Sequence, residues 1–161
     1  MELPESLTVA QLEELRQEHI GRLLLRAHRA FSERALRKLR QRGYVGLNMA
    51  HTVLLAQLDV QGTQATVLAE RAGITKQAAG RLIADLVREG YIQRFPHPID
   101  QRATTIVFTD AGWQFLVDAY YVKKEIEAEY SALLGEEPMR HLRCSLQVLI
   151  DGSSEISTAR S

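Results

Sequence analysis

The sequence predicts a mainly α-helical protein that carries one small β-hairpin. Apolar residues recur at three- and four-residue spacings along most of the 161 residues, which is typical of amphipathic helices. The pattern changes to alternation over residues 91–95 and 104–108, which are rich in β-branched and aromatic residues. A short helix, a Gly-containing turn and a longer helix are predicted directly before the first alternating stretch.

The longer of these two helices is predicted over residues 75–89. Thr75 is the expected N-cap, because its hydroxyl can accept an amide hydrogen of the first turn, and Gly90 is the expected stop. The shorter helix is predicted to open at Thr63 and to end at Gly73. Two helices joined by a three-residue turn have the spacing of a helix-turn-helix, so residues 75–89 are predicted to enter a DNA major groove.

The N-terminal part predicts one long helix over residues 8–42, which begins with a capping box formed by Thr8 and Gln11. A helix of this length spans about 50 Å. A small domain cannot cover its apolar stripe from end to end. We therefore expect part of this helix to form the interface of a homodimer.

The remaining segments complete the predicted architecture. Asn48 is expected to cap a helix over residues 49–58, and residues 96–102 form the proline-containing tip of the hairpin, which is predicted to be a wing. Thr109 and Asp110 begin a helix that ends near Leu134, and a last helix follows. The fold class is thus a winged helix-turn-helix with N- and C-terminal dimerisation helices. The predicted domains are a helical dimerisation domain (1–45 and 111–151), a DNA-binding domain (46–110) and a disordered tail (152–161).

Composition narrows the class of protein. The net charge is zero, with 20 basic and 20 acidic residues, but residues 16–42 hold nine basic against two acidic residues. No apolar run reaches ~18 residues, the acidic N-terminus does not resemble a signal peptide, and the single cysteine excludes an intramolecular disulfide, so a cytoplasmic protein without membrane contact is expected. No catalytic motif is present, so neither an enzyme nor a cofactor is predicted.

Three stretches resemble the MarR family of winged helix-turn-helix transcription regulators. They are residues 47–55, residues 68–92, and residues 94–103 followed by 109–112, with Asp100, Gln101 and Arg102 matching the family's Asp-x-Arg wing signature. The resemblance covers about residues 15–150. It implies a homodimer bound to a pseudo-palindromic operator in double-stranded DNA. It also implies repression released by a small aromatic or anionic effector, or in some branches by an oxidant or a metal.

Candidate DNA contacts follow from the predicted helix-turn-helix and wing. Arg can pair with guanine and Gln with adenine in the major groove, and an Arg at a wing tip can enter the minor groove, where Asp100 would orient Arg102. Side chains and amides at the hairpin and at the start of the preceding helix are expected to hold phosphates. The candidate residues are Thr63, Gln64, Thr75, Lys76, Gln77, Arg81, Arg94, Asp100, Arg102 and Thr104. The wing departs from the family pattern at Phe95, His97, Ile99 and Gln101.

The resemblance also places an effector pocket near the start of the helix over residues 49–58. Its candidate members are Arg26, His28, His51, Thr52 and Tyr120, although for each one core or interface packing is the competing interpretation. No metal site is predicted. Cys144 is expected to pack in a core rather than to sense oxidants, because no second cysteine accompanies it.

Two alternatives stay open at this point. One is a redox- or zinc-responsive regulator on the same fold. The other is a winged-helix module for protein interaction without specific DNA binding. The second alternative draws support from residues 61–110, which hold only six basic against five acidic residues.

Overall fold

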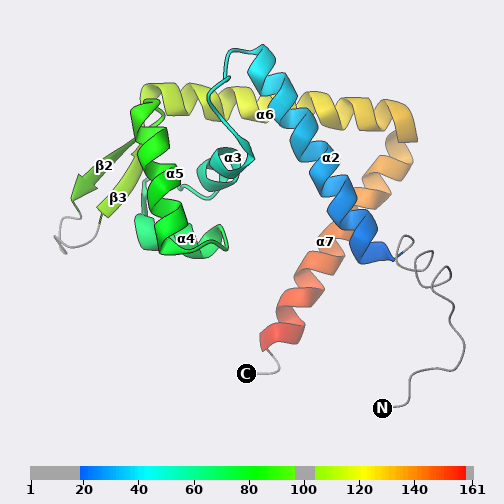
Figure 1. Ribbon diagram of the computed structural model, residues 1–161. Coiled ribbons are helices and arrows are strands. Elements are labelled where there is room, and N and C mark those ends of the chain that lie inside the picture. The colour runs from blue at the N-terminus through cyan, green and yellow to red at the C-terminus, as the bar shows by residue number, and fades with distance from the viewer. Residues whose placement is uncertain (1–18, 97–103, 159–161) are drawn as a thin grey trace, which may run out of the picture. The chain divides into compact units, whose positions relative to one another are not determined.

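The computed structural model describes residues 19–96 and 104–158, and only the backbone over 153–158 (Figure 1). The chain divides into two compact units, residues 1–119 and 120–161. The helix α6 (Asp110–Leu134) contributes residues to both.

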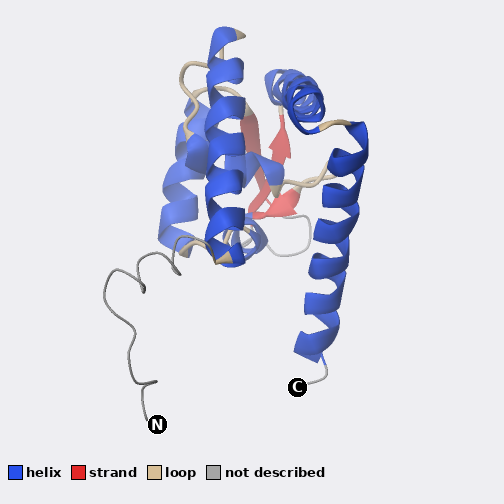
Figure 2. Cartoon of the chain, turned by 90° about the vertical axis from the view of Figure 1, so that its right-hand side faces the viewer, coloured by secondary structure: helices blue, strands red, loops and turns tan. Residues whose placement is uncertain are grey.

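The first unit combines helices with a short antiparallel sheet, as the sequence predicts (Figure 2). The strand order is β1-β3-β2, with Thr63 of β1 opposite Ile106 and with Ile92 of β2 opposite Phe108. The elements before α6 are α2 (Ile20–Gln41), α3 (Met49–Ala56), β1 (Thr63–Gln64), α4 (Ala65–Arg71), α5 (Lys76–Arg88), β2 (Ile92–Pro96) and β3 (Thr104–Phe108).

A common apolar core joins α3, α4, α5 and the sheet. α5 packs against α3, α4 and β2, and α4 also packs against β1 and β3. The three helices and the strands β2 and β3 each contribute at least one fully buried aliphatic side chain to this core. The most buried are Leu54, Leu55, Leu68, Ile83, Leu86, Ile92 and Ile106.

The loop between α2 and α3 is fixed to the first turns of α6. The Tyr44 hydroxyl donates a hydrogen bond to Asp118 Oδ2 at 2.5 Å. The Tyr44 ring meets Phe115 edge-on at a centroid distance of 5.3 Å, and Tyr91 completes the cluster. Burial and the hydrogen bond to Asp118 raise the pKa of Tyr44. This cluster therefore holds the two ends of the helix-turn-helix segment together.

The predicted helix ends are confirmed at the start of α3, α5 and α6. The Asn48 side chain accepts a hydrogen bond from the His51 amide at 3.0 Å, and the Thr75 hydroxyl accepts one from Ala78 at 3.2 Å. The Thr109 hydroxyl accepts one from the Gly112 amide at 3.1 Å. Gly90 follows α5 with φ 80°, a conformation that suits glycine at a helix end.

The prediction of one uninterrupted helix from residue 8 to 42 is wrong at His19, and residues 8–18 lie outside the described residues. α2 begins at Ile20, and His19 before it has an extended backbone with φ −60° and ψ 129°. The His19 ring nitrogen Nδ1 accepts a hydrogen bond from the Gly21 amide at 3.1 Å, which is the arrangement of an N-cap. Thr8 and Gln11, the expected capping box, lie outside the described residues.

The predicted helical start at Thr63 is also wrong. Thr63 and Gln64 form β1, and α4 begins at Ala65. Thr63 pairs with Ile106, 43 positions later in the chain, so strand pairing with a distant segment overrides the local helical pattern. Gly62 before it has φ 94°, and an added Cβ would lie 2.8 Å from Val107.

The second unit holds the rest of α6 and the helix α7 (Glu136–Thr158). Gly135 between them has φ 95°, and Glu136 and Glu137 lie in the first turn of α7, where the helix dipole favours acids. The predicted disordered tail over 152–161 is wrong as far as Thr158, because α7 continues to that residue. The helix can continue because no proline follows Pro138. The Gln147 side chain also donates a hydrogen bond to Asp151 at 2.9 Å, one turn along the helix and directly before residue 152. None of the described helices is both long and apolar enough to cross a membrane.

Candidate nucleic-acid interface

The first turns of α5 present a polar surface above a buried apolar face. Ala79, Ile83 and Leu86 are buried, which fixes the rotation of the helix about its axis. Thr75, Lys76, Gln77 and Arg81 are all exposed. The expected base-contacting side chains therefore share an accessible surface, with donors and acceptors that suit the edges of bases.

The start of α5 is held by the turn that precedes it. The Ile74 amide donates to Ala69 at 3.0 Å, and Gly73 in the turn has φ 64°. α4 packs against α5. The angle between these two helices is thus determined by packing and by the glycine turn, as in a helix-turn-helix.

A polar contact also links α3 to α5. His51 is buried, its Nδ1 accepts from the Asn48 amide at 3.3 Å, and its Nε2 lies 3.7 Å from Asp85 Oδ2. Asp85 in turn pairs with Arg88 at 2.7 Å. Sequence reasoning did not identify Asp85. Its position could have indicated the contact, because Asp85 lies among the apolar residues of the helix predicted over 75–89 and a carboxylate placed there needs a partner.

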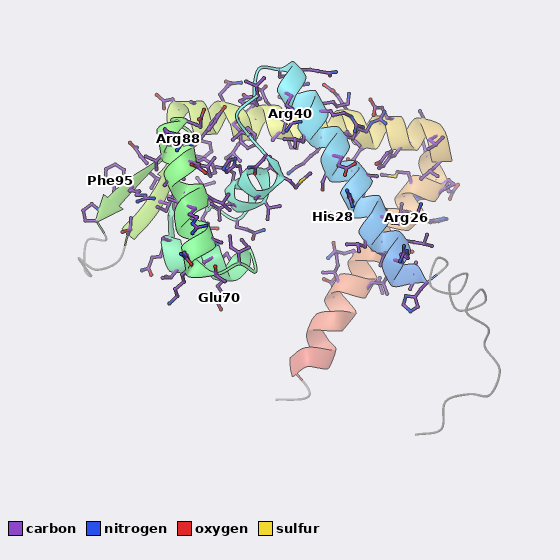
Figure 3. The ribbon with its side chains drawn as sticks, in the orientation of Figure 1. Arg26, His28, Arg40, Glu70, Arg88 and Phe95 are labelled. Carbon is purple, nitrogen blue, oxygen red and sulfur yellow. The ribbon has the colours of Figure 1, made fainter. Side chains whose placement is uncertain are left out.

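The hairpin over β2 and β3 lies next to α5, as expected for a wing. Arg94 and Phe95 on β2 are exposed, and Figure 3 shows Phe95 pointing away from the sheet. Thr104 is half-buried and pairs with Pro96 at the open end of the ladder. Asp100 and Arg102 lie outside the described residues, so the expected tip contacts stay predictions.

The Thr63 hydroxyl is bonded within the chain, and the phosphate contact expected at this residue stays a prediction. Thr63 is only 5% exposed, and its hydroxyl accepts from the Asp59 amide at 2.9 Å and donates to Asp59 Oδ2 at 3.1 Å. Arg71 donates to the same carboxylate oxygen at 2.8 Å and to the Gln57 carbonyl at 3.2 Å. The hydrogen bonds from Arg71 and then Thr63 lower the pKa of Asp59. Gln64 is half-buried and makes no side-chain cap bond.

The expected effector residues lie in different environments. Arg26 and His28 are exposed on α2 (Figure 3), whereas His51 is buried on α3. Thr52 is half-buried and donates to the Met49 carbonyl at 2.8 Å. Tyr120, in the second unit, is exposed and meets Tyr121 edge-on at 5.5 Å. His51 and Thr52 are therefore adjacent on α3, whereas Arg26 and His28 lie two residues apart on α2.

Cys144 is exposed on α7, so the expectation that it packs in a core is wrong for the single chain. Its neighbours in sequence include Arg140 and Arg143, which pair with Glu137 and Glu127. Among the described residues no group of three or more His, Cys, Asp or Glu side chains is placed to hold a metal ion.

Comparison with known proteins supports the interpretation of this segment. Residues 46–103 match the model of the MarR family. An HTH-type transcriptional regulator of Mycobacterium tuberculosis is 29% identical over 110 residues, which make up 64% of this chain and 77% of the relative.

Solved structures share the fold. A MarR transcriptional regulator from Methanosarcina mazei superposes with a TM-score of 0.72 at 21% identity, over 85% of this chain and 97% of that chain. Wild-type apo MarR of Escherichia coli superposes with a TM-score of 0.70 at 17% identity, over 81% of this chain and 96% of that chain. Residues 46–103, which hold the exposed surface of α5 and the strand β2, therefore match the MarR family model, and the chain is similar to HTH-type transcriptional regulators over 110 residues.

Proposed function

We propose that the protein is a homodimeric, sequence-specific DNA-binding repressor that a small-molecule effector releases from its operator. The observation that carries this proposal is the exposed polar surface of α5, formed by Lys76, Gln77 and Arg81 over a buried apolar face. Arg81 would pair with guanine and Gln77 with adenine, each worth ~1–3 kcal/mol of discrimination. Lys76 and Thr75 would hold a base edge or a phosphate beside them.

The wing and its surroundings would hold the duplex backbone. Arg94 and Thr104 lie along the hairpin, and Gln64 lies where α4 begins. Asp100 and Arg102 at the hairpin tip would reach the adjacent minor groove. Thr63 is the weakest candidate of this set, because its hydroxyl is bonded to Asp59. These contacts would position α5 rather than read the sequence.

The homodimer is supported by apolar side chains that one chain leaves exposed. On α2 these include Ile20 and Leu25, which are 62% and 67% exposed. On α7 they include Val148, Leu149 and Ile150. Patches of this kind on terminal helices are typical of subunit interfaces. A twofold dimer would present two copies of α5 to half-sites one helical turn apart, which requires a pseudo-palindromic operator.

Release by an effector would act through the spacing of the two α5 helices. A ligand changes this spacing only if it binds one arrangement more tightly than the other. The candidate contacts within the first unit are Arg26, His28, His51 and Thr52, and Tyr120 of the second unit is a separate candidate; their cationic, aromatic and hydroxyl groups suit a small aromatic or anionic compound. Repression follows if the operator overlaps a promoter.

The first experiment is selection of bound duplexes from a random pool, followed by binding measurements on the enriched sequence. An inverted repeat is expected. Arg81→Ala should weaken binding to that sequence at least tenfold and should change binding to random duplex much less. Arg40→Ala, which removes an exposed arginine from α2, is the matched control and should bind the operator nearly as well as the wild type.

The alternatives give different results. Failure to enrich any sequence would favour a protein-interaction module. Arg102→Ala is expected to lower affinity on every duplex and to reduce the dependence of log K on log salt concentration by about one. Release of the operator by small aromatic anions would support the effector, whereas release only by an oxidant or by a zinc chelator would favour the redox- or zinc-responsive alternative.

A further inference from the structure

The exposed side of α5 carries a glycine in the middle of the helix. Gly80 has helical residues on both sides, since α5 runs from Lys76 to Arg88. It is exposed, and it is not one of the glycines with positive φ. A Cβ added at Gly80 would meet no atom within 4 Å. Neither the backbone conformation nor the packing of the described residues therefore requires a glycine at this position.

A glycine inside a helix is unfavourable relative to alanine. A requirement for it would therefore arise from a partner that approaches the helix closely. Gly80 lies one turn after Lys76 and Gln77, on the same side of the helix, and directly before Arg81. It thus lies inside the surface that is proposed to face the major groove.

The space left by the missing side chain of Gly80, here called the notch, favours an apolar group of the partner. Inside an α-helix the amide of residue 80 is bonded to the carbonyl of residue 76, so the notch offers C–H surface and no free donor. Among the groups that base pairs present in the major groove, the C5-methyl of thymine is apolar, whereas the others are hydrogen-bond donors or acceptors.

We infer that Gly80 forms a notch that receives the C5-methyl group of a thymine in each half-site. This inference rests on the proposed DNA-binding function. It adds that α5 approaches one base edge closely and that Gly80 determines part of the sequence specificity. A methyl group at residue 80 and a methyl group on the base would compete for the same space.

The test is a double-mutant cycle in which Gly80→Ala adds a methyl group to the protein and deoxyuridine removes a methyl group from the DNA. Each thymine of the selected operator is replaced in turn by 2′-deoxyuridine, symmetrically in both half-sites, and the affinities of the wild type and of Gly80→Ala are measured. Gly80→Ala should bind the thymine operator about tenfold more weakly than the wild type. At one symmetric position, deoxyuridine should restore Gly80→Ala to within about twofold of the wild type, because the alanine methyl then fills the space of the missing base methyl.

Gly152→Ala is the matched control. Gly152 lies in the helix α7, and an added Cβ there would also meet no atom within 4 Å. Both substitutions should raise Tm by roughly 1–4 °C through helix propensity, which also shows that the variants fold. Only Gly80→Ala should alter binding to the operator.

The outcomes separate this inference from the function on which it rests. If the wild type enriches an operator and Gly80→Ala binds it equally well, or if no deoxyuridine position restores binding, the notch is refuted and the DNA-binding function stands. If the wild type enriches no sequence, the proposed function fails and the notch fails with it.

Discussion

The winged helix-turn-helix segment and the terminal helices differ in how completely one chain buries their apolar side chains. Leu54, Leu86 and Ile106 of the winged segment are at most 1% exposed. In contrast, Leu25 of α2 is 67% exposed and Val148 of α7 is 70% exposed. One chain therefore buries the apolar core of the winged segment by itself. The helices α2 and α7 leave apolar side chains exposed, which a second chain would cover.

The largest expected effect tests the completeness of the winged core. Leu86→Ala removes a side chain with no exposed surface from the contact of α5 with its neighbours. We expect the free energy of unfolding to fall by about 2–5 kcal/mol, because the deletion loses transfer energy and leaves a cavity. Urea unfolding measures the change.

A neighbouring residue provides the control for this core substitution. Val87→Ala truncates a side chain that is 37% exposed on the same helix and should cost much less. Equal losses for the two variants would show that the face of α5 turned toward the core is assigned wrongly.

The second prediction tests whether a second chain covers the exposed apolar side chains of α7. Leu149 is 55% exposed and lies on one stripe of α7 with Leu142 and Leu146. Leu149→Glu should raise the dimer dissociation constant about 100-fold, because an unpaired charge would be buried in the apolar interface. Sedimentation equilibrium measures the change.

Gln147→Glu is the control, because it adds the same charge on another side of α7, and this variant should stay dimeric. If the two variants dissociate equally, the stripe of Leu142, Leu146 and Leu149 is not the interface.

Elements with local signals are the ones that the sequence predicted correctly. The caps at Asn48, Thr75 and Thr109 involve partners within three residues, so the pattern around each residue was sufficient. The alternation of apolar and polar residues over β2 and β3 likewise indicates the hairpin, whereas its register is seen only in the structure.

The errors come from contacts that the local pattern does not contain. Thr63 looked like a helix start, but its environment is set by pairing with Ile106 and by the hydrogen bonds to Asp59. Cys144 was expected to pack in a core because no second cysteine accompanies it, yet one chain leaves it exposed. The polar surface of α5 was predictable from helical spacing alone, whereas the buried contact between His51 and Asp85 depends on how α3 packs against α5.

The third prediction concerns the N-cap of α5. Thr75→Ala removes the hydroxyl that accepts the Ala78 amide at 3.2 Å. The expected loss of stability is ~1 kcal/mol, smaller than that of the core substitution because the amide regains contact with water. Thr66→Ala, at an exposed position inside α4, is the control and should change the stability by less than about 0.5 kcal/mol in the same thermal or urea unfolding.

The smallest expected effect is a pH dependence that originates at the edge of the winged core. Arg71 and Thr63 lower the pKa of Asp59 in the folded protein relative to its unfolded value of about 4. The folded state therefore binds the Asp59 proton less readily than the unfolded state. The resulting stabilisation is fully present above about pH 4 and is lost as the pH falls through the folded pKa.

Urea unfolding of the wild type and of Asp59→Asn across this pH range isolates that contribution. The stability difference between the two proteins should be largest near neutral pH and should shrink steadily as the pH is lowered below about 4, because protonated Asp59 resembles asparagine. Glu70→Gln removes a different exposed carboxylate from α4 and serves as the control for general charge effects. A difference between wild type and Asp59→Asn that stays constant down to acid pH would mean that Arg71 and Thr63 do not hold the Asp59 carboxylate in solution. The position of β1 would then depend on its pairing with β3 and on its packing against α4.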